Sequence, residues 1–164
     1  MAEALLRARL AARGVGEVHL RSAGLLAGGV PATKGARGIV GGLDGHVSRR
    51  LSSDLVTAAD LVVGMAREHV REAVLLDRGA FPRSFTLKEL VRRGSAAGAR
   101  RAGETMPEWL HRVGAHRKPA DLLGASPDDD VADPIGGPPS AYEATAAELD
   151  GLVARLVELA WPAW

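Results

Sequence analysis

The chain contains no cysteine among its 164 residues. This absence excludes disulfide bonds, thiolate zinc sites and cysteine catalysis by these residues. Aromatic residues make up only 4% of the chain, so an aromatic binding wall has few candidates. The formal net charge is +1, without the basic excess that marks a nucleic-acid-binding protein. We therefore expect no nucleic-acid partner.

Long apolar segments are also missing. No run approaches the roughly 20 residues that a membrane-spanning helix needs. Residues 1–7 lack the basic and apolar regions of a secretory signal. We therefore expect a cytoplasmic location and no membrane partner. Hydrophobic residues make up 46% of the chain, as in a typical globular protein, and the length favours a single domain over residues 1–164.

Helical and strand patterns alternate along the chain. Residues 2–13 are rich in Ala, Leu and Arg, which predicts a helix, whereas residues 17–21 alternate polar and apolar side chains as a strand does. The apolar run 59–64 predicts a buried parallel strand. Further helices are expected at residues 32–40, 44–56, 65–74, 87–93, 108–115 and 140–160. This alternation predicts a three-layer α/β/α fold with a small parallel sheet.

Two local patterns bear on chemistry. Asp133-Pro134 is followed by Gly136-Gly137, and an Asp-Pro pair of this kind is by itself a common turn. None of the five histidines takes part in a metal-binding motif; they are His19, His46, His69, His111 and His116. We therefore expect no metal and no cofactor.

The order of several segments resembles that in a known enzyme family. Five segments carry the resemblance: residues 1–6 (MAEALL), 22–24 (SAG), 43–51 (LDGHVSRRL), 59–65 (ADLVVGM) and 133–134 (DP). They are similar to motifs of the low-molecular-weight protein-tyrosine phosphatases. Together they span nearly the whole chain. Only residues 95–128 have no counterpart, and we interpret them as an irregular insertion within the domain.

The resemblance implies a mechanism and a set of roles. In the family, a cysteine thiolate attacks the phosphorus of a phosphate ester, and an aspartate protonates the leaving group. Asp133 matches that general acid, while Ser22 and His46 match residues that brace the phosphate-binding loop. For the substrate wall the candidates are Ile135, which stands where the family often has an aromatic residue, and Tyr142. With Ile135 in place of an aromatic residue, no ring stacks on a phosphotyrosine at this position. This argues against a preference for phosphotyrosine, but not against hydrolysis of phosphate monoesters.

In the family, a first strand in the interior of the sheet and a Cys-x5-Arg phosphate loop come before the segment that matches residues 1–6. In this chain, that segment begins at Met1. We therefore expect an N-terminally truncated chain, either through a start codon placed too late or through a real truncation. The resemblance implies that a complete chain would hydrolyse phosphotyrosine in a protein, or a similar small aryl phosphate. The chain as written is expected to be inactive, because it has no cysteine. The alternative is a non-catalytic remnant that acts as a binding module. Arsenate reduction would need relay cysteines, which this sequence does not have.

Overall fold

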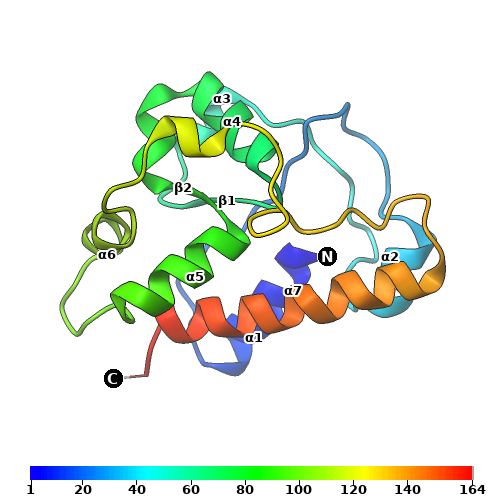
Figure 1. The fold of residues 1–164 in the computed structure, drawn as a ribbon. Coiled ribbons are helices and arrows are strands. Elements are labelled where there is room, and N and C mark those ends of the chain that lie inside the picture. The colour runs from blue at the N-terminus through cyan, green and yellow to red at the C-terminus, as the bar shows by residue number, and fades with distance from the viewer. Residues whose placement is uncertain (164) are drawn as a thin grey trace. The chain divides into compact units, whose positions relative to one another are not determined.

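The computed structural model describes residues 1–163. They divide into two compact units: unit 1 comprises residues Met1–Arg50 and Val131–Val157, and unit 2 comprises Leu51–Asp130 and, of the described residues, 158–163. Figure 1 labels the helices and strands of both units. Within residues 1–163, no helix is both long enough and apolar enough to span a bilayer.

Unit 2 is built on a parallel β–α–β motif. Strand β1 (Val62–Gly64) pairs in parallel with strand β2 (Ser84–Thr86). The connection contains helix α4 (Arg67–Leu76), which packs on both strands, and the 3-10 helix η1 (Arg78–Arg83) (Figure 1). Parallel strands require a crossover of this kind, usually a helix. The predicted α/β class with a small parallel sheet is therefore confirmed.

Helices α5 (Leu87–Ala97) and α6 (Met106–Val113) close the core of unit 2. Helix α6 begins with a capping box, in which the Thr105 hydroxyl and the Glu108 carboxylate each accept a hydrogen bond from the other residue's main-chain N–H. The largest fully buried apolar side chains include Val70, Phe85, Leu87, Leu90, Trp109 and Leu110. These residues form the apolar interior that holds the two short strands in place.

Residues 95–128 contribute to this core. They supply helix α6 and the 3-10 helix η2 (Pro119–Leu122). A further helix of unit 2, the short α3 (Ser53–Thr57), lies before strand β1 and outside this segment. Trp109, from the middle of the segment, is completely buried. The segment therefore has a packing role in unit 2, and its description as an insertion relative to the family stays a prediction.

A buried arginine joins the loop after α6 to strand β2. The Arg117 guanidinium donates to both carboxylate oxygens of Glu89 at 2.7 and 3.1 Å, and to the main-chain oxygens of Phe81 and Ser84 at 3.0 and 2.7 Å. It also lies over the rings of Phe81 and Phe85, 4.6 and 3.9 Å from their centroids. Only 2% of the Arg117 side chain is exposed, so this charge depends on Glu89 for its compensation.

In unit 1, helix α1 (Ala2–Ala12) packs against helix α7 (Pro139–Ala160), the last residues of which belong to unit 2. The third helix of the unit is α2 (Lys34–Ile39). The buried cluster consists of Ala36, Val40, Leu43, Tyr142 and Ala146, with Met1, Ala4, Leu5 and Ala32 packed against it. Farther along both helices, Arg9 forms an ion pair with Asp150. The contacts advance together in sequence, so α1 and α7 run in the same direction.

The strand predicted at residues 17–21 is wrong. These residues are extended but form no ladder with any part of residues 1–163. A strand is held by main-chain hydrogen bonds to a neighbour. Alternating side chains therefore do not make a strand where the described chain offers no partner for it.

The helix predicted at residues 44–56 is also wrong over most of its length, because only Ser53–Thr57 is helical. Gly45 adopts a φ of +78°, which is left-handed backbone. Directly after it, the main-chain N–H of Ser48 donates to the oxygen of Val30 at 2.8 Å. This long-range pairing replaces the local hydrogen bonds that a helix would need, although the apolar spacing suits a helix.

An ion pair between Glu104 and Arg112 makes part of the stability of unit 2 depend on pH. The Arg112 guanidinium donates to both Glu104 oxygens at 3.0 and 2.8 Å, and these bonds are the main reason that the pKa of Glu104 falls to about 2. An unfolded glutamate titrates at about 4.3. The stabilisation is therefore complete above about pH 4.3, and it is lost as the pH falls through the folded pKa.

We expect Glu104→Gln to flatten the acid limb of the stability curve. Urea unfolding at several pH values from neutral to acid should show a wild-type stability that falls more steeply than that of the variant below about pH 4.3. Glu143→Gln, which changes an exposed carboxylate, is the matched control and should leave the slope unchanged. Parallel acid limbs for the wild type and Glu104→Gln would contradict the assignment.

Candidate functional site

A tight turn at the start of helix α7 carries Asp133. Its Oδ1 accepts a hydrogen bond from the main-chain N–H of Ile135 at 3.0 Å. The next turn is closed by the N–H of Gly137 donating to the oxygen of Pro134 at 2.9 Å. Gly136 occupies the third position of this turn with a φ of +80°, which is the type II geometry that favours glycine. The sequence Asp-Pro-Ile-Gly-Gly thus fixes the backbone around an exposed carboxylate.

The turn is anchored on both sides. Pro134 is buried, and the Thr145 hydroxyl of α7 donates to the main-chain oxygen of Ala132 at 3.3 Å. Pro139 opens the helix, a position that suits proline because the first N–H groups of a helix need no intrahelical acceptor. Asp133 is therefore an exposed acid on a held backbone.

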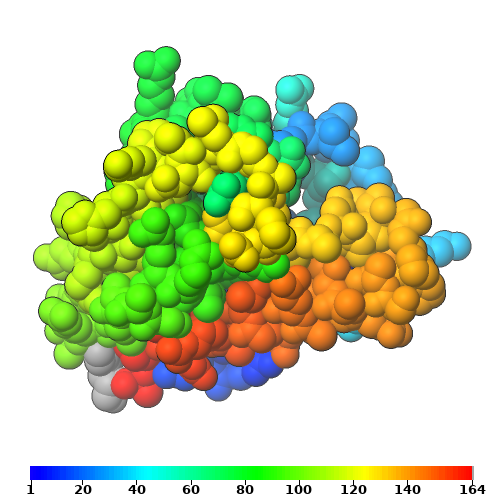
Figure 2. Space-filling view, in the orientation of Figure 1, coloured from blue at the N-terminus to red at the C-terminus, as the bar shows by residue number. Residues whose placement is uncertain are grey.

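Within unit 2, the last residues of the Leu51–Asp130 stretch are held by charge. Asp129 forms ion pairs with Arg67 and Arg92 at 2.7 and 2.8 Å, and Asp130 accepts from the main-chain N–H of Arg67 at 2.8 Å. Burial would raise the pKa of the Asp129 carboxyl, but the two arginines lower it overall. In Figure 2 this part of the chain (yellow) lies at the surface beside the green of helix α5. Residues 126–130 are thus held in place within unit 2.

The two substrate-wall candidates lie in different environments. Ile135 is 69% exposed at the tip of the turn. Tyr142 is buried in the cluster of unit 1, where its ring covers Gly35 so closely that an added Cβ there would lie 2.9 Å from a ring atom. This burial favours a packing role for Tyr142, and the wall role stays a prediction.

Ser22 and His46 are both brought near Glu3, in the first turn of α1. The Ser22 hydroxyl donates a short hydrogen bond to Glu3 Oε2, and Arg7 donates to Oε1 at 2.8 Å. Partial burial would raise the pKa of Glu3, but the bonds from Ser22 and Arg7, with the charges of Arg7 and His46, lower it overall. Of the predicted bracing pair, Ser22 binds Glu3 directly, whereas His46 acts on it through charge alone, and the bracing role stays a prediction.

Glu3 is the residue that sequence reasoning missed. A glutamate four residues before an arginine on a helix is usually a surface ion pair, and Glu3 and Arg7 do form one. Nothing in that spacing indicates Ser22 as a further partner. The signal that could have found it is the position of Glu3 in the first turn of the helix, within the family motif at residues 1–6.

The first turn of α1 leaves main-chain donors open. Within residues 1–163, no side chain caps this helix at Met1. The first N–H groups of a helix have no intrahelical acceptor, and together with the helix dipole they favour an anion. Because Met1, Ala4 and Leu5 pack on the same cluster as Tyr142, the start of α1 and the start of α7 share one core. Asp133 directly precedes that part of α7.

Comparison with known proteins finds one matching family model and several similar structures. The model of a family described as low molecular weight phosphotyrosine protein phosphatase matches residues 1–96. No curated protein sequence gives a significant match.

Solved structures agree with that match. The arginine phosphatase YwlE from Geobacillus stearothermophilus is 26% identical, with a TM-score of 0.65; the match covers 96% of this chain and 80% of that one. A YwlE mutant from Bacillus subtilis is 28% identical with a TM-score of 0.64, covering 96% and 86%. A low molecular weight protein tyrosine phosphatase from T. tengcongensis is 27% identical with a TM-score of 0.66, covering 96% and 87%.

Proposed function

Because the chain belongs to the low molecular weight phosphotyrosine protein phosphatase family, we propose that its site serves phosphate-ester hydrolysis on proteins, with Asp133 as the general acid. The observation that carries this proposal is the held turn at Asp133. It presents an exposed carboxylate on a fixed backbone at the start of a helix that packs on the first turn of α1.

Each part of the site has a chemical role in this proposal. The open N–H groups at the start of α1 bind the phosphate oxygens, because they point along the positive end of the helix. Asp133 gives a proton to the leaving oxygen and then takes one from the attacking water. In a chain that carries the phosphate-binding loop, Ser22 and His46 would brace it; here the Ser22 hydroxyl donates to Glu3.

The reaction also needs a nucleophile, and no cysteine is present. We propose that the residues of this chain alone do not turn over a phosphate ester. A chain extended at its N-terminus by a strand and a Cys-x5-Arg loop would hold the thiolate, and the loop arginine would clamp two phosphate oxygens. Asp133 would then act on the leaving group as described.

The substrate class can be tested by comparing phosphotyrosine with phosphoarginine. The names of two of the similar structures identify arginine phosphatases or their mutants, and another is a tyrosine phosphatase. Ile135 offers no ring to stack on a phosphotyrosine. We therefore propose that the complete enzyme shows little preference for phosphotyrosine over phosphoarginine in peptides of one sequence; with phosphoarginine, Asp133 would protonate a leaving nitrogen in place of the ester oxygen. Rates on such a peptide pair measure this preference.

The second candidate function is a binding module without turnover, and the missing cysteine is the observation that favours it. The two candidates differ in what lies upstream of Met1 in the gene. An in-frame Cys, five residues, Arg and Ser-Pro would favour the enzyme, and a stop codon or unrelated sequence would favour the module.

The decisive test uses the chain as given and the chain extended through its upstream reading frame. We expect no hydrolysis of p-nitrophenyl phosphate by the former. In the extended chain, Asp133→Asn should lower kcat by about a hundredfold, because an amide cannot protonate the leaving group. Asp128→Asn, at an exposed aspartate nearby, should leave kcat unchanged. An unchanged kcat in Asp133→Asn would remove Asp133 from the mechanism.

A further inference from the structure

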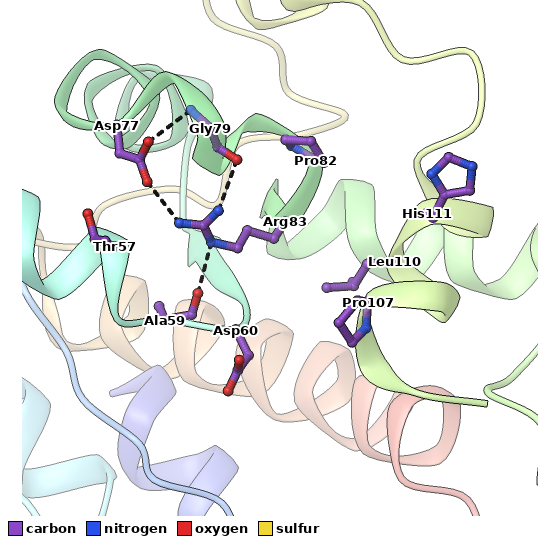
Figure 3. A pocket seen from close by; sticks show the side chains of 10 residues that line it. All are labelled: Thr57, Ala59, Asp60, Asp77, Gly79, Pro82, Arg83, Pro107, Leu110 and His111. Atoms are coloured by element: carbon purple, nitrogen blue, oxygen red, sulfur yellow. Dashed lines mark hydrogen bonds and ion pairs between the residues drawn. The ribbon is translucent and has the colours of Figure 1, made fainter. Parts of the chain in front are cut away.

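Unit 2 contains a cavity of about 620 Å³ that is formed without Asp133, Ser22 or His46. Its wall comes from the chain just before strand β1, from helix η1 and from one face of helix α6. Figure 3 shows the Arg83 side chain in the middle, with Thr57 and Asp77 on one side and Pro107, Leu110 and His111 on the other. The volume is in the range of small-molecule sites.

Arg83 forms a fixed part of this wall. Its guanidinium donates to the main-chain oxygens of Ala59 and Gly79, each at 2.9 Å, and to that of Val56 at 3.2 Å. It also donates to Asp77 at 2.9 Å, and the other oxygen of Asp77 accepts from the N–H of Gly79. Nearly all its N–H groups are therefore committed, and it has no paired donors left for an incoming carboxylate or phosphate.

The remaining charge in the cavity is negative. Arg83 and Asp77 cancel one another, whereas Asp60 is exposed and has no hydrogen bond or ion pair to any of residues 1–163. The formal charges of the side chains that line the cavity therefore add up to −1 when His111 is neutral. At 4 Å from Asp60 in water, a cation is favoured over an uncharged ligand by about 1 kcal/mol, which is about fivefold, and an anion is disfavoured by a similar amount.

The α6 side of the cavity is apolar. Pro107 and Leu110 face it, and Pro82 comes from η1 (Figure 3). Such a wall binds a hydrocarbon body, while a carboxylate binds an ammonium group at its end. We propose that this cavity binds a small organic cation, an ammonium group on a compact apolar body, with Asp60 as the residue that selects the charge.

The test titrates benzylamine into the ¹⁵N-labelled chain at pH 8, where an ordinary histidine is neutral. We expect saturable amide shifts confined to residues 57–60, 77–83 and 107–111. Benzyl alcohol, of the same shape but uncharged, should bind about fivefold more weakly. Benzoate should bind more weakly still, because its charge is repelled by Asp60.

Three variants complete the experiment. Asp60→Asn should weaken benzylamine binding about fivefold, and Asp60→Lys should reverse the preference towards benzoate. Asp54→Asn, at another exposed aspartate of unit 2, should leave the affinity unchanged. Equal binding of benzylamine and benzoate, an unchanged affinity in Asp60→Asn, or shifts outside the lining would each overturn the proposal.

Discussion

Arg117→Met is expected to lower the free energy of unfolding by about 3–5 kcal/mol, the usual cost of removing one partner of a buried ion pair. The Glu89 side chain is 6% exposed, and among residues 1–163 it would keep the ion pair with Arg93, at 3.0 Å. The main-chain oxygens of Phe81 and Ser84 would also lose their donor. Urea unfolding followed by circular dichroism measures the loss.

Two further variants separate charge from packing at this position. Arg78→Met, at an exposed arginine of η1, should change stability by less than about 0.5 kcal/mol. The double variant Arg117→Met with Glu89→Leu should regain much of the loss, because no uncompensated carboxylate remains in the core. A double variant as unstable as the single one would show that the guanidinium stack on Phe81 and Phe85 is the larger contribution.

Trp109→Ala is expected to cost about 3–5 kcal/mol. The indole is completely buried, and its Nε1 donates to the oxygen of Gly98 at 3.1 Å. It packs so closely on α5 that a Cβ added at Gly94 would lie 3.2 Å from an atom of the ring. Truncation would therefore leave a large cavity that this close packing cannot readily close.

A matched pair of variants checks the cause. Trp109→Phe keeps a ring but loses the hydrogen bond, and it should cost less than Trp109→Ala. Leu75→Ala removes an apolar side chain that is 70% exposed and should cost little. If Trp109→Ala were as mild as Leu75→Ala, helix α6 would not be part of the core of unit 2.

Helices with their own start signals could be predicted from the sequence. The predicted helices at 108–115 and 140–160 are found at Met106–Val113 and Pro139–Ala160. In the first, Thr105 supplies the cap, and in the second proline opens the helix. These signals act over a few residues, so they do not depend on what packs against the helix.

Features that depend on distant partners could not be predicted. Residues 17–21 have a strand pattern but no strand, because pairing is a property of two segments. The buried Arg117 has no sequence signal either, since arginine is mostly an exposed residue. At the candidate site, the family motifs indicated Ser22 and His46, while the hydrogen bond from Ser22 to Glu3 was found only in the structure.

The division of the chain between the two units has a consequence for biosynthesis. Most of unit 2 is one continuous stretch, Leu51–Asp130, whereas unit 1 is assembled from two stretches with that stretch between them. Bringing the two stretches of unit 1 together closes a long loop, which loses chain entropy before the contacts between them can compensate. On the ribosome the β–α–β motif can fold as soon as it emerges. Helix α1 can pack early on Ala36, Val40 and Leu43, but its contacts with α7 form only after the intervening stretch has been made, so the core of unit 1 is completed late in synthesis.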